Sequence, residues 1–157
     1  KLLHPYYALA EKYNLPVGIH TGLAGPNHGC PNFRVGLGSP ILMEDLILKF
    51  PKLRIWIMHS GYPFIEETVG IMSVYWNVYT DISVIANPDN IPYKDFHTTM
   101  KRLIDAGLEN RVMFGSDNGN IKQVIESVNK LDFLSSEQKE KIFHKNAEQF
   151  FEKSKKN

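Results

Sequence analysis

Three scarcities limit what this 157-residue chain can be. It has one cysteine, Cys30, so no internal disulfide can form, and a lone thiol is typical of a reducing compartment; we therefore expect a cytoplasmic protein. No apolar run approaches the ~18 residues of a transmembrane helix, which argues against a membrane protein. The net charge is only +1, from 18 basic and 17 acidic residues, so nothing electrostatic predicts nucleic-acid binding.

The remaining composition is that of a globular protein. Hydrophobic residues make up 43% of the chain and charged residues 22%. The length suits one hydrophobic core, and we expect residues 1–157 to form a single domain. Because the chain begins at Lys1 and not at a methionine, we expect it to be trimmed or to belong to something longer.

Strand-like and helix-like patterns alternate along the chain. Helical spacing predicts helices over 5–13, 41–50, 64–75, 95–106, 120–131 and 136–152. Short β-branched or aromatic runs predict strands over 16–20, 54–59, 77–83 and 111–115, and a long loop rich in glycine and proline covers 21–40. Such alternation predicts a parallel sheet, either a small doubly wound sheet or part of a (β/α)8 barrel. A whole barrel needs about 250 residues, so this chain would be roughly half of one.

Polar side chains end three of the predicted strands. His20 follows Pro16-Val17-Gly18-Ile19, His59 follows Arg54-Ile55-Trp56-Ile57-Met58, and Asp117 follows Arg111-Val112-Met113-Phe114-Gly115-Ser116. Imidazole and carboxylate are common metal ligands and proton carriers. Taken singly, each histidine fits a core residue bonded to a backbone carbonyl better than a ligand, and Asp117-Asn118-Gly119 is ordinary turn chemistry.

Spacing favours the functional interpretation. His20 and His59 are one strand-helix-strand step apart, and His59 and Asp117 are two such steps apart. All three should therefore lie at the carboxyl edge of one parallel sheet, where α/β proteins place their sites.

With these residues the chain resembles the carboxyl-terminal half of the amidohydrolase superfamily. The similarity is to the amidohydrolase-2 group, which includes aminocarboxymuconate-semialdehyde decarboxylase, hydroxybenzoate decarboxylases and lactone hydrolases. The stretches that carry it are Leu15 to Gly22, Phe50-Pro51-Lys52-Leu53, His59-Ser60-Gly61, Asn77 to Ser83, Phe114 to Asp117 and Lys145-Asn146-Ala147-Glu148.

The resemblance implies a fold and a site. The fold would be strands 5 to 8 of a TIM-type (β/α)8 barrel, four parallel strands with helices. His20 would be a metal ligand on the fifth strand, His59 an acid/base or carbonyl polariser on the sixth, and Asp117 a metal ligand and proton acceptor on the eighth. The divalent metal would be zinc, with manganese the other possibility.

The chain also departs from the family pattern. The family's first strand carries a His-x-His pair, and no two of the six histidines here are two residues apart. Asn118-Gly119 stands where the family often has an aromatic residue and proline. Two protein ligands hold zinc more weakly than three or four.

Other polar residues are weaker candidates. His28 and Arg34 lie in the long loop that would overhang the site; Arg34 could pair with a substrate carboxylate and His28 could reach the ion, although exposed loop residues look the same in sequence. Asp81 ends a predicted strand at the same edge and could orient His59 or His20, or cap the following turn.

We therefore expect a metal-dependent hydrolase of an amide, ester or lactone, or a non-oxidative decarboxylase, acting on a small carboxylate, amide or lactone. The alternative is a truncated, catalytically silent half-barrel that acts only through self-association or with an amino-terminal partner. In either case we expect a homo-oligomer or a missing amino-terminal half, since four strands with open edges need covering.

Overall fold

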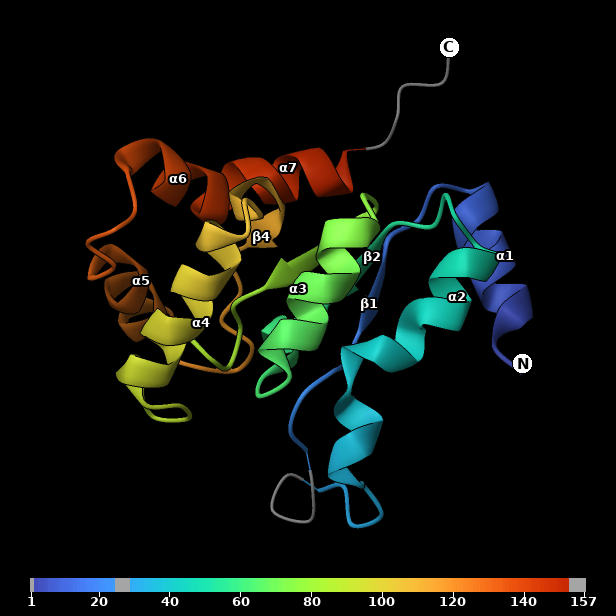
Figure 1. Ribbon diagram of the computed structural model, residues 1–157, viewed down its shortest axis with the longest axis horizontal. Helices are drawn as coiled ribbons and strands as arrows, with labels where there is room; N and C mark the ends of the chain where they lie inside the picture. The colour runs from blue at the N-terminus through green and yellow to red at the C-terminus, as the bar shows by residue number, and fades with distance from the viewer. Residues whose placement is uncertain (1, 25–28, 153–157) are drawn as a thin grey trace.

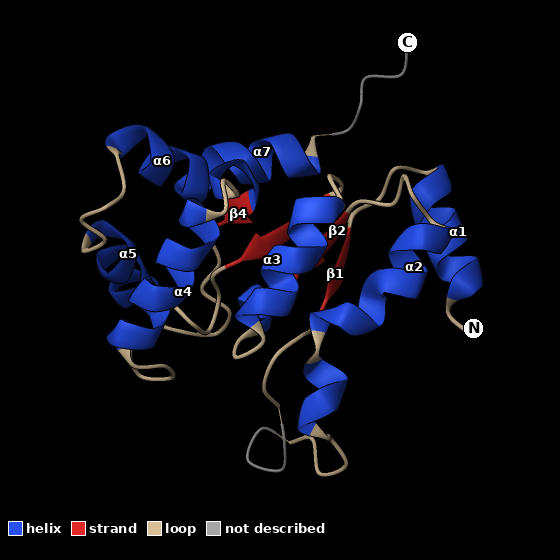
Figure 2. Ribbon diagram, viewed as in Figure 1, coloured by secondary structure: helices blue, strands red, loops and turns tan. Residues whose placement is uncertain are grey.

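The computed structural model of the protein describes residues 2–24 and 29–152 (Figure 1). Four strands form one parallel sheet (Figure 2): β1 (Val17–Ile19), β2 (Ile55–Ile57), β3 (Val78–Asp81) and β4 (Val112–Met113). Their order in the sheet is β1-β2-β3-β4, the order of the sequence. A doubly wound sheet reverses its strand order at a switch point, so this unreversed order decides between the two predicted architectures in favour of a barrel segment.

Helices separate the strands as predicted. They are α1 (His4–Lys12), η2 (Val35–Gly38), η3 (Pro40–Met43), α2 (Glu44–Lys49), η4 (Met58–Gly61), α3 (Ile65–Val74), α4 (Tyr93–Asp105), η5 (Glu109–Arg111), α5 (Ile121–Asn129), α6 (Ser136–Glu140), the π-helical turn η6 (Lys141–Lys145) and α7 (Asn146–Phe151). The helix predicted over 136–152 is thus three consecutive pieces. A capping box begins the first piece, because Ser135 Oγ accepts from Gln138 N at 3.2 Å and Gln138 Oε1 accepts from Ser135 N at 3.0 Å.

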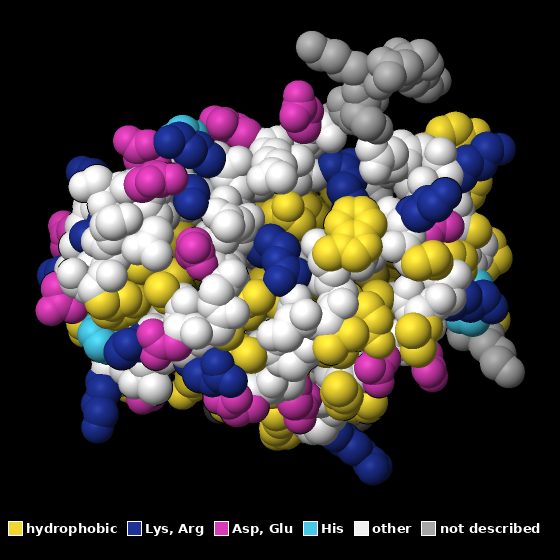
Figure 3. Space-filling view, turned by 45° about the horizontal axis from the view of Figure 1, so that its top comes forward, with side chains coloured by type: hydrophobic (Ala, Val, Ile, Leu, Met, Phe, Trp, Pro, Cys, Tyr) yellow, Lys and Arg dark blue, Asp and Glu magenta, His cyan; other side chains and the backbone are white. Residues whose placement is uncertain are grey.

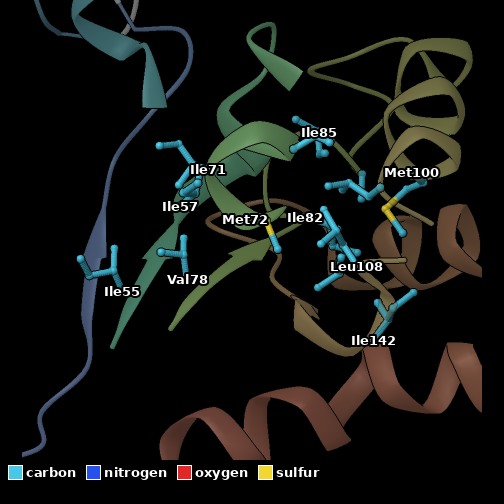
Figure 4. Packing of buried hydrophobic residues seen from close by; sticks show 14 of the residues in the cluster. Ile55, Ile57, Ile71, Met72, Val78, Ile82, Ile85, Met100, Leu108 and Ile142 are labelled. Atoms are coloured by element: carbon cyan, nitrogen blue, oxygen red, sulfur yellow. The ribbon is translucent and has the colours of Figure 1, made fainter. Parts of the chain in front are cut away.

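The hydrophobic core lies between the sheet and the helices that follow its strands. Ile55 and Ile57 of β2 and Val78 of β3 are completely buried and pack with residues such as Ile71 and Met72 of α3 (Figure 4). The register pairs Ile55 with Val78 and Ile57 with Thr80, so neighbouring strands present the same face at the same level. On the other face alternate residues point away from these helices, as the period of two requires.

Helices α4 and α1 differ in how far their apolar side chains are buried. On α4, Phe96, Met100 and Leu103 are buried and Ile104 is partly buried, and Gly107 follows the end of the helix with a φ of +72°. On α1, in contrast, Tyr6 and Leu9 remain 69% and 51% exposed, although they recur at helical spacing. The pattern correctly indicates a shared face, but nothing in the described part of this chain covers it.

Helix α7 lies across the end of the sheet where the strands begin (Figure 1). The ring of Phe150 lies 5.8 Å from that of Trp56 and 4.6 Å from that of Tyr79, side chains from neighbouring strands. Arg54, just before β2, donates to the carbonyls of Asn14 and Phe150 and so ties α7 to the segment before β1. This end of the sheet is closed, and any site must lie at the opposite end.

The surface carries both signs of charge together with apolar side chains (Figure 3). Within the described ranges, no helix is long and apolar enough to cross a membrane. Exposed apolar residues are frequent on and near α1 and α2: Leu2, Leu3, Tyr6, Leu9, Tyr13, Leu37, Ile41, Leu42 and Leu48.

Candidate active site

His59 occupies the turn that follows β2. Its backbone and that of Ser60 are left-handed, with φ of 60° and 50°, a conformation that costs a non-glycine residue about 1–2 kcal/mol. Hydrogen bonds from β3 hold the turn, because Asp81 Oδ1 accepts from His59 N at 3.0 Å and Ser60 Oγ donates to the Asp81 carbonyl at 2.8 Å. Gly61 must be glycine here, since its φ is +66° and a Cβ would lie 2.5 Å from Thr68 Oγ1. The turn therefore presents the imidazole in one orientation.

Asp81 is the hub of the hydrogen bonds beneath the turn. The residue is 8% exposed. Its Oδ1 accepts from His59 N, from Ser83 N at 2.9 Å and from Ser83 Oγ at 2.5 Å, and its Oδ2 accepts from Trp56 Nε1 at 3.0 Å. Hydrogen bonds to a charged carboxylate are strong, so Asp81 fixes the positions of the groups that donate to it. The sequence suggested that Asp81 either orients a histidine or caps the following turn. Asp81 does orient His59, but it acts through the His59 backbone and through Ser83, and it does not contact the imidazole ring.

The two candidate histidines face each other at the carboxyl edge of the sheet. His59 Nε2 lies 3.2 Å from His20 Nδ1, and the ring centroids are 4.9 Å apart at 71°. His20 follows β1 directly and is exposed, while His59 is half-buried. Next to His20, the Thr21 hydroxyl donates to the Met58 carbonyl at 2.7 Å, which keeps the two strand ends together. The expectation that spacing brings these histidines to one place is met.

Asp117 lies four residues beyond the end of β4. Its side chain is exposed, its φ is 51°, and Gly119 N donates to the Ser116 carbonyl at 2.9 Å. The turn chemistry that competed with a ligand role is therefore present. Across residues 2–24 and 29–152, no three His, Cys, Asp or Glu side chains are grouped closely enough to hold a metal ion.

The long loop holds the two remaining candidate residues, His28 and Arg34. His28 lies outside the described residues. Arg34 is exposed just before η2, and its carbonyl accepts from Leu37 N at 2.8 Å. A cavity of about 730 Å³ opens beside His20. Its walls come from α1, the end of β1, η3 and α2, and its lining residues include Tyr7, Ile19 and Leu42.

Ser83 is the site residue that the sequence did not single out. Its hydroxyl lies 2.8 Å from His59 Nδ1 and its carbonyl oxygen 3.2 Å from the same atom. The signal available was its place two residues beyond Asp81 at the same predicted edge. A serine at a strand end is too common to be selected by that signal alone.

Near the ends where the strands begin, burial shifts the pKa of two side chains. Burial raises the pKa of Tyr79, and the nearby cations of Arg111 and Arg54 partly oppose this. Burial also lowers the pKa of Arg54, which still remains far above neutrality as a guanidinium. Tyr79 is therefore neutral at physiological pH and serves as a packing surface for Phe150.

Parallel strands in sequential order, with polar side chains gathered at their carboxyl ends, are the arrangement found in α/β barrel proteins. The family can be stated from the sequence match. Residues 1–153 match the Amidohydrolase family (Amidohydro_2), and the chain belongs to it.

Solved structures show the same fold. An uncharacterized TIM-barrel protein from Bordetella bronchiseptica is 24% identical with a TM-score of 0.77, over 94% of this chain and 49% of that one. The 5-carboxyvanillate decarboxylase of Sphingomonas paucimobilis is 16% identical with a TM-score of 0.67, over 94% and 52%. The chain thus spans about half the length of these TIM-barrel proteins, which confirms the predicted fold class.

One curated relative also matches. Protein fluG of Emericella nidulans is 31% identical over 72 residues, which are 46% of this chain and 8% of that protein. A match this partial adds to the family relationship without indicating an activity.

Proposed function

We propose that the protein carrying this chain is a metal-dependent enzyme of the amidohydrolase-2 type. It would hydrolyse an amide, ester or lactone, or decarboxylate an aromatic or unsaturated acid without an oxidant. The observation that carries the proposal is the pair His20 and His59, whose ring nitrogens lie 3.2 Å apart at the carboxyl edge of the sheet. Parallel α/β folds place reacting groups at this edge, and the opposite edge is closed by α7.

The donor set fits a divalent metal only in part. His20 and Asp117 would be this chain's ligands, and the remaining ligands would come from outside the described residues. When bound, the ion would polarise a carbonyl and lower the pKa of a bound water. Two structures of similar fold hold such ions: an amidohydrolase from Burkholderia multivorans with zinc and a decarboxylase from Polaromonas with manganese.

The chain's own residues would then divide the proton chemistry. Asp117, exposed on its turn, would accept a proton from the attacking water. Once protonated on both ring nitrogens, His59 would donate a proton to the leaving group, or a hydrogen bond to the developing oxyanion, from the nitrogen that faces His20. Thr21 and Ser60 would keep the strand ends in register while this happens.

Structures of similar fold suggest which substrates to test. They include 2,6-dihydroxybenzoate decarboxylase and a probable 2-pyrone-4,6-dicarboxylic acid hydrolase, both named for small carboxylates. We expect the native protein that carries this chain to turn over an acid of this kind, with activity lost on chelation and restored by zinc or manganese. General acid–base catalysis contributes about 10²–10⁴-fold, so His59→Gln should lower kcat by at least 100-fold.

The matched control is His97→Gln. His97 lies on α4, where its ring packs on Phe133 at 5.0 Å, away from the histidine pair. This variant should keep wild-type kcat and metal content, whereas Asp117→Asn should lose both. If His59→Gln and His97→Gln prove equally active on every substrate that the native protein accepts, the assignment of His59 is wrong.

A second candidate is a catalytically silent half-barrel. It is favoured by the absence of any group of three metal-binding side chains in the described residues and by the exposed apolar side chains of α1. A native protein that neither retains metal nor acts on these acids, yet associates through this surface, would support it.

A further inference from the structure

Two oxygens of Ser83 face one nitrogen of His59. Ser83 Oγ lies 2.8 Å and the Ser83 carbonyl oxygen 3.2 Å from His59 Nδ1. The carbonyl oxygen can only accept, and the hydroxyl proton is committed to Asp81 Oδ1 at 2.5 Å, since a carboxylate only accepts. Both oxygens therefore require a proton on Nδ1, and this fixes a tautomer that atomic positions alone leave open.

The tautomer at His59 has a consequence at His20. A neutral imidazole protonated at Nδ1 carries its lone pair at Nε2. That nitrogen faces His20 Nδ1 at 3.2 Å, so His20 donates in this pair. Hydrogen bonds thus run in one direction, from His20 to His59, from His59 to Ser83 and from Ser83 to Asp81.

The backbone around Ser83 is held in an unusual form. Val84 has a φ of 65°, rare for a β-branched residue, and Ile85 N donates to the Ser83 carbonyl at 2.7 Å across it. The turn directs the Ser83 carbonyl and hydroxyl to the same ring nitrogen. Strain of this kind persists where the surroundings fix it, and Asp81 Oδ1 does so by accepting from Ser83 N at 2.9 Å.

We propose that Ser83, anchored by Asp81, is a positioning residue that fixes His59 in its Nδ1–H tautomer and turns the lone pair of Nε2 toward His20. The importance of this for catalysis rests on the proposed function of His59. The tautomer itself does not, and it can be measured without any substrate.

The first experiment is nitrogen NMR of the full chain labelled at histidine. Long-range ¹H–¹⁵N correlations report which ring nitrogen is protonated, and His59 is assigned from the signals lost in His59→Gln. For the neutral ring of His59 we expect the Nδ1–H pattern. The opposite tautomer in the wild-type chain would overturn the proposal by itself.

Variants then test the role of the hydroxyl. Ser83→Ala removes the acceptor at 2.8 Å and leaves the carbonyl at 3.2 Å, so the Nε2–H pattern should appear beside the Nδ1–H pattern. Ser83→Cys, close in size but a poor acceptor, should give a smaller change and guards against loss of the fold. Ser127→Ala, a buried serine on α5, is the matched control and should leave the His59 pattern unchanged. An unchanged pattern in Ser83→Ala would contradict the proposal.

Kinetics of the native protein distinguish positioning by Ser83 from the proposed catalytic role of His59. Loss of an orienting partner typically costs 10–100-fold in activity, and we expect Ser83→Ala to lower kcat by this factor with KM and metal content little changed. If the NMR pattern is as expected but His59→Gln remains active, the positioning stands and the proposed catalytic role of His59 fails. If His59→Gln is inactive and Ser83→Ala is fully active, positioning by Ser83 is refuted and the proposed function stands.

Discussion

At the scale of single residues, left-handed backbone is concentrated at the candidate site. Among the described residues, positive φ occurs at five non-glycine positions, and four of them follow β2, β3 or β4: His59, Ser60, Val84 and Asp117. Ser60 and Val84 do not belong to the residue types that adopt this conformation most readily after glycine, which are asparagine, aspartate and histidine. Each costs about 1–2 kcal/mol, which the fold offsets elsewhere. Such positions deserve testing because strain of this kind clusters at functional sites.

Val84 offers a direct measurement of this strain. In ordinary backbone, glycine is about 0.5–1 kcal/mol less stable than alanine, because it loses more freedom on folding. At a φ of 65° the order should reverse. We therefore predict that Val84→Gly unfolds at a higher urea concentration than Val84→Ala, by about 1 kcal/mol in the free energy of unfolding. Both variants lose the two γ-methyl groups of Val84 and differ only in Cβ, whose clash with the backbone is what a positive φ penalises; equal stability would mean that the left-handed turn does not form.

At the scale of elements, Phe150 supplies the buried apolar contact between α7 and the sheet. Phe150 is 1% exposed and contacts the rings of Trp56 and Tyr79, whereas its neighbour Phe151 is 48% exposed. Truncating a buried phenylalanine costs about 3–5 kcal/mol. We predict a loss of this size for Phe150→Ala in denaturant unfolding, and less than half of it for Phe151→Ala. Equal losses would mean that α7 does not close the sheet in the way described.

The elements were largely predictable from the sequence because their signals are local. Each strand is a short run of β-branched or aromatic residues, and these runs place His20 and His59 at strand ends without reference to anything distant. Ser83 was not predictable, because its contact with His59 depends on a left-handed turn at Val84, where no glycine or asparagine signals it. The exposure of α1 was not predictable either, since periodicity shows which side chains share a face but not whether the chain supplies a partner for it.

One contact between elements bears on how the sheet ends. Phe114 N, just beyond β4, donates to the Ile142 carbonyl of the π-helical turn η6 at 2.7 Å. In a closed barrel this side of β4 faces the next strand. A helix carbonyl therefore meets β4 here, and Asn146 Nδ2 adds bonds to the Glu109 and Val112 carbonyls, both at 2.7 Å. The β4 edge is thus partly protected by the chain's own carboxyl-terminal helices.

At the scale of the whole molecule, the β1 side is the exposed one. Leu9 and Tyr13 of α1 are 51% and 62% exposed, and the cavity of about 730 Å³ opens between this helix and α2. Soluble monomers rarely expose apolar patches of more than a few hundred Å² unless a partner covers them. In a TIM barrel, strands and helices of the other half would occupy this position.

We predict that the 157-residue chain, by itself, associates through the exposed apolar side chains Tyr6, Leu9 and Tyr13, which we call the α1 surface. Sedimentation equilibrium should show a dimer or larger species whose population rises with concentration, because burial of apolar area drives association. Leu9→Glu places a charge within this surface and should weaken the association by at least tenfold. Val74→Glu is the matched control, since Val74 is 72% exposed at the end of α3, outside the α1 surface. If the chain stays monomeric, or if Leu9→Glu and Val74→Glu weaken its association equally, then the apolar face of α1 does not hold the copies together.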